Sequence, residues 1–278
     1  EEEQNGDVTV HVETDVKNER AESGTVTVRT TILNDQGEVV SKEAGEKEVT
    51  VGAEEEVTAE QDVVVNKPEL WDCDNPNLYY VQTEILEDGE VIDSYETEFG
   101  FRYLEYDADF GFKLNGENVK MKGVCMHHDQ GALGAASYYD AVKRQVEILK
   151  GMGVNAIRAS HNVPSDMLIS ICNEEGILVM NEIFDGWTEY KNGNTNDFGK
   201  EFNKKLAADN QVIGGSEDKT WAQFALESTV NRDKNDPCVV MWSIGNELPT
   251  GCTGEGASNA QATYPDIAAD LIKWIQDI

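Results

Sequence analysis

The sequence predicts two domains: an Ig-like antiparallel β-sandwich over residues 1–103, then the N-terminal half of a (β/α)8 TIM barrel, with about four βα units, over 104–278. Two patterns predict this. Apolar and polar residues alternate between turn signals through the first hundred residues, and strand-like and helix-like segments alternate from about residue 118. The charge changes near the same place, because residues 1–109 hold 31 of the 54 acidic residues but 7 of the 22 basic ones.

Period-two alternation predicts the strands of the sandwich. From Val8 to Val16 every second residue is valine or threonine and the residues between them are polar, which indicates a half-buried strand. Asp88-Gly89 and the stretch 34–37 are hairpin turn signals. Further strands are expected over 25–33, 39–40, 47–51, 56–65, 79–87 and 90–98. The Cys…Trp…Cys arrangement of antibody domains is missing, so the prediction is an Ig-like sandwich only.

The second domain begins with a predicted hairpin over 111–117 that turns at Asn115-Gly116, and strands then alternate with helices. Apolar residues at helical spacing, with Ser137 as a cap and glycines at the ends, predict the helices. Strands are expected over 119–126, 154–159, 177–184 and from 239, and helices over 138–152, 166–175, 221–233 and 264–278. Such alternation is typical of a parallel sheet with helices outside.

Polar residues stand at the end of each of the four predicted barrel strands. The carboxyl ends of parallel strands meet at one edge, where barrel enzymes carry their active sites, so these residues are candidates for one site. The first three groups are His127, His128 and Asp129; Arg158 and His161; and Glu182, Asp185 and Trp187. The fourth strand is a continuous apolar run that leads into Asn246 and Glu247.

Composition excludes several functional classes. The net charge of −32 argues against nucleic acid and anionic membranes, because both need a basic surface, and is better explained by solubility than by cation binding. Five cysteines without a CxxC pair predict neither a disulfide framework nor a zinc site. No signal peptide is visible, and no stretch reaches the roughly 18 apolar residues of a membrane span. Since the chain starts without Met, we expect a truncated N-terminus; the compartment stays open, with the cytoplasm favoured.

Six segments together resemble those of a known family. They are Pro68-Glu69-Leu70-Trp71, Asn75-Pro76-Asn77-Leu78-Tyr79, Phe99-Gly100-Phe101-Arg102, Gly123-Val124-Cys125-Met126-His127-His128-Asp129, Arg158-Ala159-Ser160-His161-Asn162 and Trp242-Ser243-Ile244-Gly245-Asn246-Glu247. The first two resemble the end of the sandwich of glycoside hydrolase family 2, and the third resembles its lead into the barrel. The fourth and fifth resemble two barrel strands of that family, and the sixth resembles its acid/base motif. This family holds β-galactosidases, β-glucuronidases and β-mannosidases. The stretch Gly131-Ala132-Leu133-Gly134 after Asp129 looks most like β-galactosidase members.

The resemblance implies a parent protein that hydrolyses O-glycosidic bonds as a retaining exo-β-glycosidase, with β-galactosidase the best single guess. It assigns the acid/base role to Glu247 and places the nucleophile, a second glutamate, near the end of a seventh strand. This sequence holds no candidate for that residue, so we expect the chain alone to be inactive. The family's jelly roll and last four barrel strands are also missing from it.

The remaining roles are also implied by the resemblance, each beside a structural alternative. Asn246 would bind the sugar 2-hydroxyl or cap a loop, and Arg158 would hold Glu carboxylates by paired hydrogen bonds or form a salt bridge inside the barrel. The histidines would supply neutral donors to sugar hydroxyls, pack, or bind a metal. The third-strand motif lacks the histidine that a family magnesium site needs, so neither a metal nor another cofactor is predicted. The histidines in question are His127, His128 and His161. Asp129 and Asp185 would be sugar ligands or helix caps, and Trp187 would stack on a sugar or fill the core.

The rival hypothesis is a non-catalytic protein with a degenerate barrel that binds carbohydrate or another chain. The missing nucleophile favours it, whereas the intact acid/base motif and the histidines oppose it. The expected partner is a β-linked oligosaccharide or glycoside, with no nucleic acid and no membrane. A half barrel exposes strand edges, so we also expect self-association into a homo-oligomer, or marginal stability.

Overall fold

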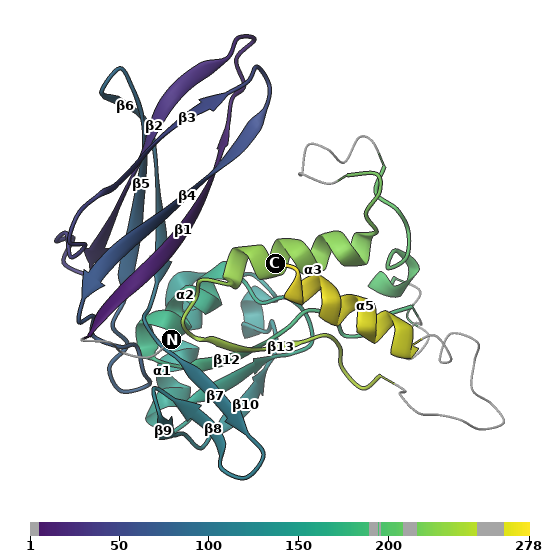
Figure 1. Ribbon diagram of the computed structural model, residues 1–278. Helices are drawn as coiled ribbons and strands as arrows, with labels where there is room; N and C mark the ends of the chain where they lie inside the picture. The colour runs from purple at the N-terminus through teal and green to yellow at the C-terminus, as the bar shows by residue number, and fades with distance from the viewer. Residues whose placement is uncertain (1–5, 189–193, 195, 208–215, 249–263) are drawn as a thin grey trace. The chain divides into compact units, whose positions relative to one another are not determined.

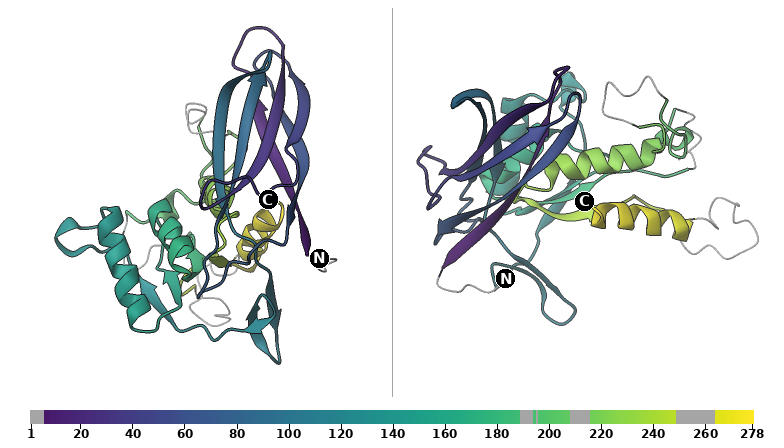
Figure 2. Two further views of the ribbon diagram at one scale, coloured as in Figure 1. Left: turned by 90° about the vertical axis from the view of Figure 1, so that its left-hand side faces the viewer. Right: turned by 45° about the horizontal axis from the view of Figure 1, so that its top comes forward.

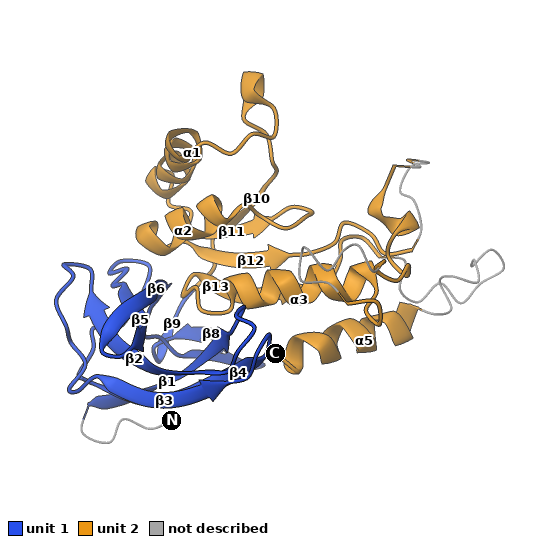
Figure 3. Cartoon of the chain, turned by 90° about the horizontal axis from the view of Figure 1, so that it is seen from above, with its two compact units in different colours: residues 1–119 blue, residues 120–278 orange. Residues whose placement is uncertain are grey.

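The computed structural model describes residues 6–188, 194, 196–207, 216–248 and 264–278. The chain forms two compact units, one over residues 1–119 and one over 120–278 (Figure 3). Figure 2 shows the first in purple to blue strands and the second in teal, green and yellow.

Unit 1 is an antiparallel sandwich, which confirms the predicted class (Figure 1). Its smaller sheet pairs β1 (Asp7–Lys17) with β4 (Glu56–Asn66), and its larger sheet has the order β3 (Gly45–Val51), β2 (Gly24–Asn34), β5 (Tyr79–Glu87) and β6 (Glu90–Phe99). The alternating residues of β2 and β4 bury Val28, Ile32, Ala59 and Val63 between the sheets. The strand expected at 39–40 is wrong, because only isolated bridges form there, Leu33 with Val39 and Ser41 with Val65.

Both predicted two-residue turns have left-handed backbone at their central residues. The φ angles are 52° and 84° at Asp88 and Gly89, and 53° and 82° at Asn115 and Gly116. This is the type I′ geometry that Asn-Gly and Asp-Gly favour, because its twist matches that of the strands it joins.

A small sheet of β7 (Leu104–Asp107), β8 (Gly111–Leu114) and β9 (Glu117–Asn118) follows the sandwich. This stretch was predicted to belong to the barrel domain, whereas it lies within unit 1. The Asn115 side chain donates to the Trp71 carbonyl at 3.0 Å, and Trp71 is fully buried in the sandwich, so this sheet is tied to unit 1. The functional boundary at 103/104 stays a prediction.

Unit 2 contains a four-stranded parallel sheet, as predicted. The spatial order equals the chain order: β10 (Gly123–Met126), β11 (Ala156–Ala159), β12 (Leu178–Glu182) and β13 (Val239–Ser243). The first strand is shorter than the expected 119–126, since the Val119 N–H pairs with the Phe112 carbonyl in unit 1. All carboxyl ends therefore lie at one edge of the sheet.

The helices of unit 2 are α1 (Tyr139–Gly151), α2 (Asp166–Glu175), α3 (Trp221–Asp233) and α5 (Tyr264–Gln276), with 3-10 turns η1 (Gly131–Leu133) and η3 (Phe198–Lys200). The sequence specifies α2 at both ends: the Ser165 hydroxyl accepts the Leu168 N–H, and Gly176 ends the helix at a φ of 69°. Helix α1 packs on α2, and α3 on α5. Within the described residues, no helix has the length and apolar character that spanning a bilayer demands.

Candidate active site

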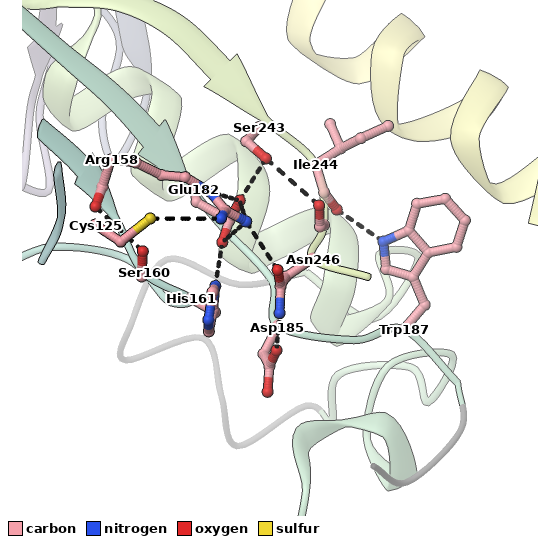
Figure 4. Close-up of polar contacts among 11 residues, drawn as sticks. Cys125, Arg158, Ser160, His161, Glu182, Asp185, Trp187, Ser243, Ile244 and Asn246 are labelled. Carbon is pink, nitrogen blue, oxygen red and sulfur yellow. Dashed lines mark hydrogen bonds and ion pairs between the residues drawn. The ribbon is translucent and has the colours of Figure 1, made fainter. Parts of the chain in front are cut away.

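Glu182, the last residue of β12, is the centre of the cluster at the strand ends. Its side chain is fully buried, at 0% exposure. Arg158 of β11 donates to it from Nε to Oε2 at 2.9 Å and from Nη2 to Oε1 at 3.0 Å and Oε2 at 2.8 Å (Figure 4). These are the paired hydrogen bonds expected of Arg158, and they raise its pKa.

Two further donors reach the same carboxylate. Ser243, at the end of β13, donates its hydroxyl to Oε2 at 2.7 Å, and His161 Nδ1 lies 2.8 Å from Oε1. Glu182 therefore joins the ends of β11, β12 and β13 (Figure 4). Glu182 was expected only as a strand-end residue, and no role was expected of Ser243. The signal for Glu182 was one carboxylate in a mostly apolar run, with an arginine on the neighbouring strand.

Asn246 is held on both sides of its amide. Its Oδ1 accepts from Arg158 Nη2 at 2.8 Å, and its Nδ2 donates to Asp185 Oδ1 at 2.9 Å. Because a guanidinium only donates and a carboxylate only accepts, these partners determine which way the amide faces. The side chain is buried, and the structure brings together three of the predicted site residues here.

Glu247 follows Asn246 on a tight turn and is exposed. Its φ is 49°, in the left-handed region, where a non-glycine residue costs about 1 kcal/mol or more and which is enriched at functional sites. A Cβ on the preceding Gly245 would lie 2.6 Å from Leu248 Cδ1 and 3.0 Å from Trp187 Nε1. The absence of a side chain at Gly245 thus lets this turn close against its neighbours.

Trp187 is a core residue, which is one of the two alternatives given for it. It is 1% exposed and belongs to a core with Phe202 and Leu226, and its ring meets that of Tyr264 edge-on at 5.1 Å. Its Nε1 donates to the Ile244 carbonyl at 2.7 Å. The buried ring offers no open face to a sugar, and its one polar atom supports the turn before Asn246.

The residues that follow β10 are exposed. The His127 ring meets the His161 ring edge-on, with centroids 4.9 Å apart, so His127 adjoins the cluster. Asp129 Oδ1 accepts the Gly131 N–H at 2.8 Å, a local turn contact just before η1, whose N-cap residue is Gln130. Cys125 Sγ lies 3.8 Å from Arg158 Nη1. His128, for its part, lines a small hollow of about 30 Å³ beside His127.

A larger hollow lies in unit 1 and carries no candidate residue. A hollow of about 440 Å³ in the sandwich is lined by residues of β1, β2, β5 and β6. Across the described residues, no three or more His, Cys, Asp or Glu side chains group in a way that would hold a metal ion. The strand-end cluster brings together one exposed carboxyl group, an oriented amide, and a histidine next to a buried carboxylate.

Comparison with known proteins gives the same two-part division. The family profile described as "Glycosyl hydrolases family 2" matches residues 1–102, and that described as "Glycosyl hydrolases family 2, TIM barrel domain" matches residues 108–266. Beta-galactosidase BoGH2A of Bacteroides ovatus is 38% identical over 239 residues, which are 86% of this chain and 26% of that protein. A putative beta-glucuronidase of Formosa agariphila is 38% identical over 210 residues, 76% of this chain and 17% of its own.

A solved structure shows the same fold. The crystal structure of a glycosyl hydrolase family 2 member from Bacteroides cellulosilyticus superposes with a TM-score of 0.81 at 34% identity, covering 98% of this chain and 32% of that one. The chain thus spans about a sixth to a third of the length of these three proteins. From its fold, its strand-end cluster and these matches, the chain belongs to glycosyl hydrolases family 2.

Proposed function

We propose that this chain is part of a retaining exo-β-glycosidase, that β-galactosides are its first candidate substrates, and that Glu247 is its acid/base. One observation carries the proposal: the residue directly before Glu247, Asn246, is fixed by Arg158 and Asp185 at the carboxyl edge of a parallel sheet. An exposed carboxyl group beside an oriented amide donor suits a sugar at that edge.

The chemistry needs two carboxyl groups about 5–5.5 Å apart. Glu247 would protonate the leaving oxygen and then take a proton from the attacking water. The other carboxylate, the nucleophile, would come from the part of the family's barrel that this chain does not span. Asn246 would hydrogen-bond the sugar 2-hydroxyl, a contact that strengthens in the transition state. We therefore propose that the chain by itself is inactive.

The charges of the cluster favour a neutral sugar over a uronic acid. The relatives include proteins named for both activities. A glucuronate carboxylate would call for a cation, and the guanidinium of Arg158 is already paired with Glu182. Asp185 adds a further negative charge next to Asn246. Within the described cluster, galactoside is therefore the better match, with its hydroxyls meeting His161 and His127.

The test uses the full-length protein that contains this chain. Wild type and Glu247→Gln are assayed on aryl β-galactosides with a good and a poor leaving group, and on the matching glucuronides. A general acid helps the poor leaving group most. The kcat/KM of Glu247→Gln should therefore fall about 10²–10⁴-fold on the substrate with the poor leaving group, and far less on the one with the good leaving group. Glu147→Gln, at an exposed site on α1, is the matched control and should behave as wild type.

Other outcomes have definite meanings. Equal losses on both leaving groups would remove the acid/base role from Glu247. Inversion at the anomeric carbon, followed by NMR of the first product, would exclude the retaining mechanism. Absence of any hydrolysis, together with measurable binding of a β-glycoside, would support the non-catalytic carbohydrate-binding alternative.

A further inference from the structure

The Glu182 carboxylate is saturated with donors. Oε2 receives Arg158 Nε, Arg158 Nη2 and the Ser243 hydroxyl, and Oε1 receives Arg158 Nη2 and lies 2.8 Å from His161 Nδ1. The group is fully buried, so water does not compete for these positions. An ionised carboxylate has about four lone-pair sites and no hydrogen to give, and here a guanidinium donates to both of its oxygens.

This saturation decides where the proton of His161 is. Since Glu182 can only accept, the short contact to His161 Nδ1 requires a hydrogen on Nδ1. A neutral imidazole carries one hydrogen, so Nε2 then holds a lone pair. The His161 side chain is 25% exposed, and no described residue forms a hydrogen bond with Nε2.

We propose that Glu182 is a positioning residue that holds neutral His161 in its Nδ1–H tautomer, so that Nε2 accepts a hydrogen bond from a sugar hydroxyl. This reverses the expectation that the histidines act as donors. The sugar as the occupant rests on the proposed function, whereas the tautomer does not. A hydroxyl that donates to Nε2 has its own oxygen lone pairs left for a second donor, which orients the sugar ring.

The same carboxylate also acts on Asn246 through Arg158. Arg158 Nη2 contacts both Glu182 and Asn246 Oδ1, so the position of the guanidinium fixes the amide. Glu182 thus orients two groups that would face the sugar, the acceptor nitrogen of His161 and the amide donor of Asn246, without facing the sugar itself.

Histidine tautomers are read directly by long-range ¹H–¹⁵N NMR of this chain labelled at its four histidines. The spectrum is taken near pH 8, above the usual histidine pKa of about 6.5, and His161→Gln assigns the signal. We expect an Nδ1–H pattern for His161 in the wild type. In Glu182→Gln the amide oxygen stays with Arg158 and Ser243, the NH₂ group faces His161 Nδ1, and the ring should change to the Nε2–H tautomer.

Glu174→Gln is the matched control, because it removes the same charge from a hydrogen-bonded glutamate on α2 and should leave the His161 pattern unchanged. An Nε2–H ring or a doubly protonated ring in the wild type would overturn the proposal. An unchanged Nδ1–H ring in folded Glu182→Gln would do the same. If that variant does not fold, the wild-type spectrum still decides. This readout involves no catalysis, so failure of the proposed glycosidase activity would not be mistaken for failure of the tautomer.

Discussion

Replacing Arg158 by methionine tests the central cluster, because it keeps an unbranched apolar stem and removes the charged guanidinium. The change deletes three hydrogen bonds to Glu182 and one to Asn246. Glu182 is 0% exposed and would keep a buried negative charge with only Ser243 and His161 as partners. Breaking a buried ion pair on one side costs about 3–5 kcal/mol. Arg158 is 31% exposed, which weakens the pair by solvent screening, so we expect about 3 kcal/mol.

Urea unfolding followed by tryptophan fluorescence measures this loss in unit 2, which contains four of the five tryptophans. With a slope of about 1–3 kcal/mol per M for a unit of this size, the midpoint should fall by about 1–3 M. Arg144→Met is the control, because Arg144 is exposed on α1, and surface substitutions change stability by about 0.5 kcal/mol or less.

The double variant Arg158→Met/Glu182→Gln separates the buried charge from the lost contacts. Removing the charge of Glu182 should recover part of the stability that Arg158→Met loses. The reasoning fails if Arg158→Met unfolds at the wild-type midpoint, or if the double variant is less stable than Arg158→Met alone.

Three further predictions concern charge and strand edges. The hydrogen bond from Lys143 lowers the pKa of Glu175. The ionised Glu175 therefore stabilises the fold fully above its unfolded pKa of about 4.3, and this stabilisation is lost as the pH falls through the lower folded pKa. Between about pH 7 and pH 3, the urea midpoint should thus fall less steeply in Lys143→Met than in the wild type. The net charge of −32 should make Tm rise with NaCl, because the Debye length shortens from about 10 Å at 0.1 M to about 3 Å at 1 M and the repulsion between like charges weakens. A Tm that stays constant in circular dichroism melts would contradict this. Among the described strands, β10 and β13 each have one unpaired edge, so sedimentation velocity of the chain should show self-association that grows with concentration, whereas a monomer at every concentration would oppose it.

Local patterns determined most of the elements of this protein. Alternation between Val8 and Val16 is a property of neighbouring residues, and β1 covers that stretch. Asp88-Gly89 and Asn115-Gly116 select type I′ turns because few other pairs tolerate two left-handed residues in succession. The apolar run that begins at Val239 likewise predicted a strand ending before Asn246 and Glu247, and parallel pairing then brought the strand ends to one edge.

Only the tertiary structure decided which strand-end groups meet. Arg158 pairs with Glu182, 24 residues away, and with Asn246, 88 residues away, and no periodicity encodes such partners. Trp187 is a core residue because Gly245 leaves room for its ring and Ile244 accepts its N–H. The sequence by itself determined the strands and the kind of chemistry at their ends, since both follow from local pattern and residue type. The buried carboxylate that orients a histidine and an amide depends on side chains from three strands, so it exists only once the sheet has formed.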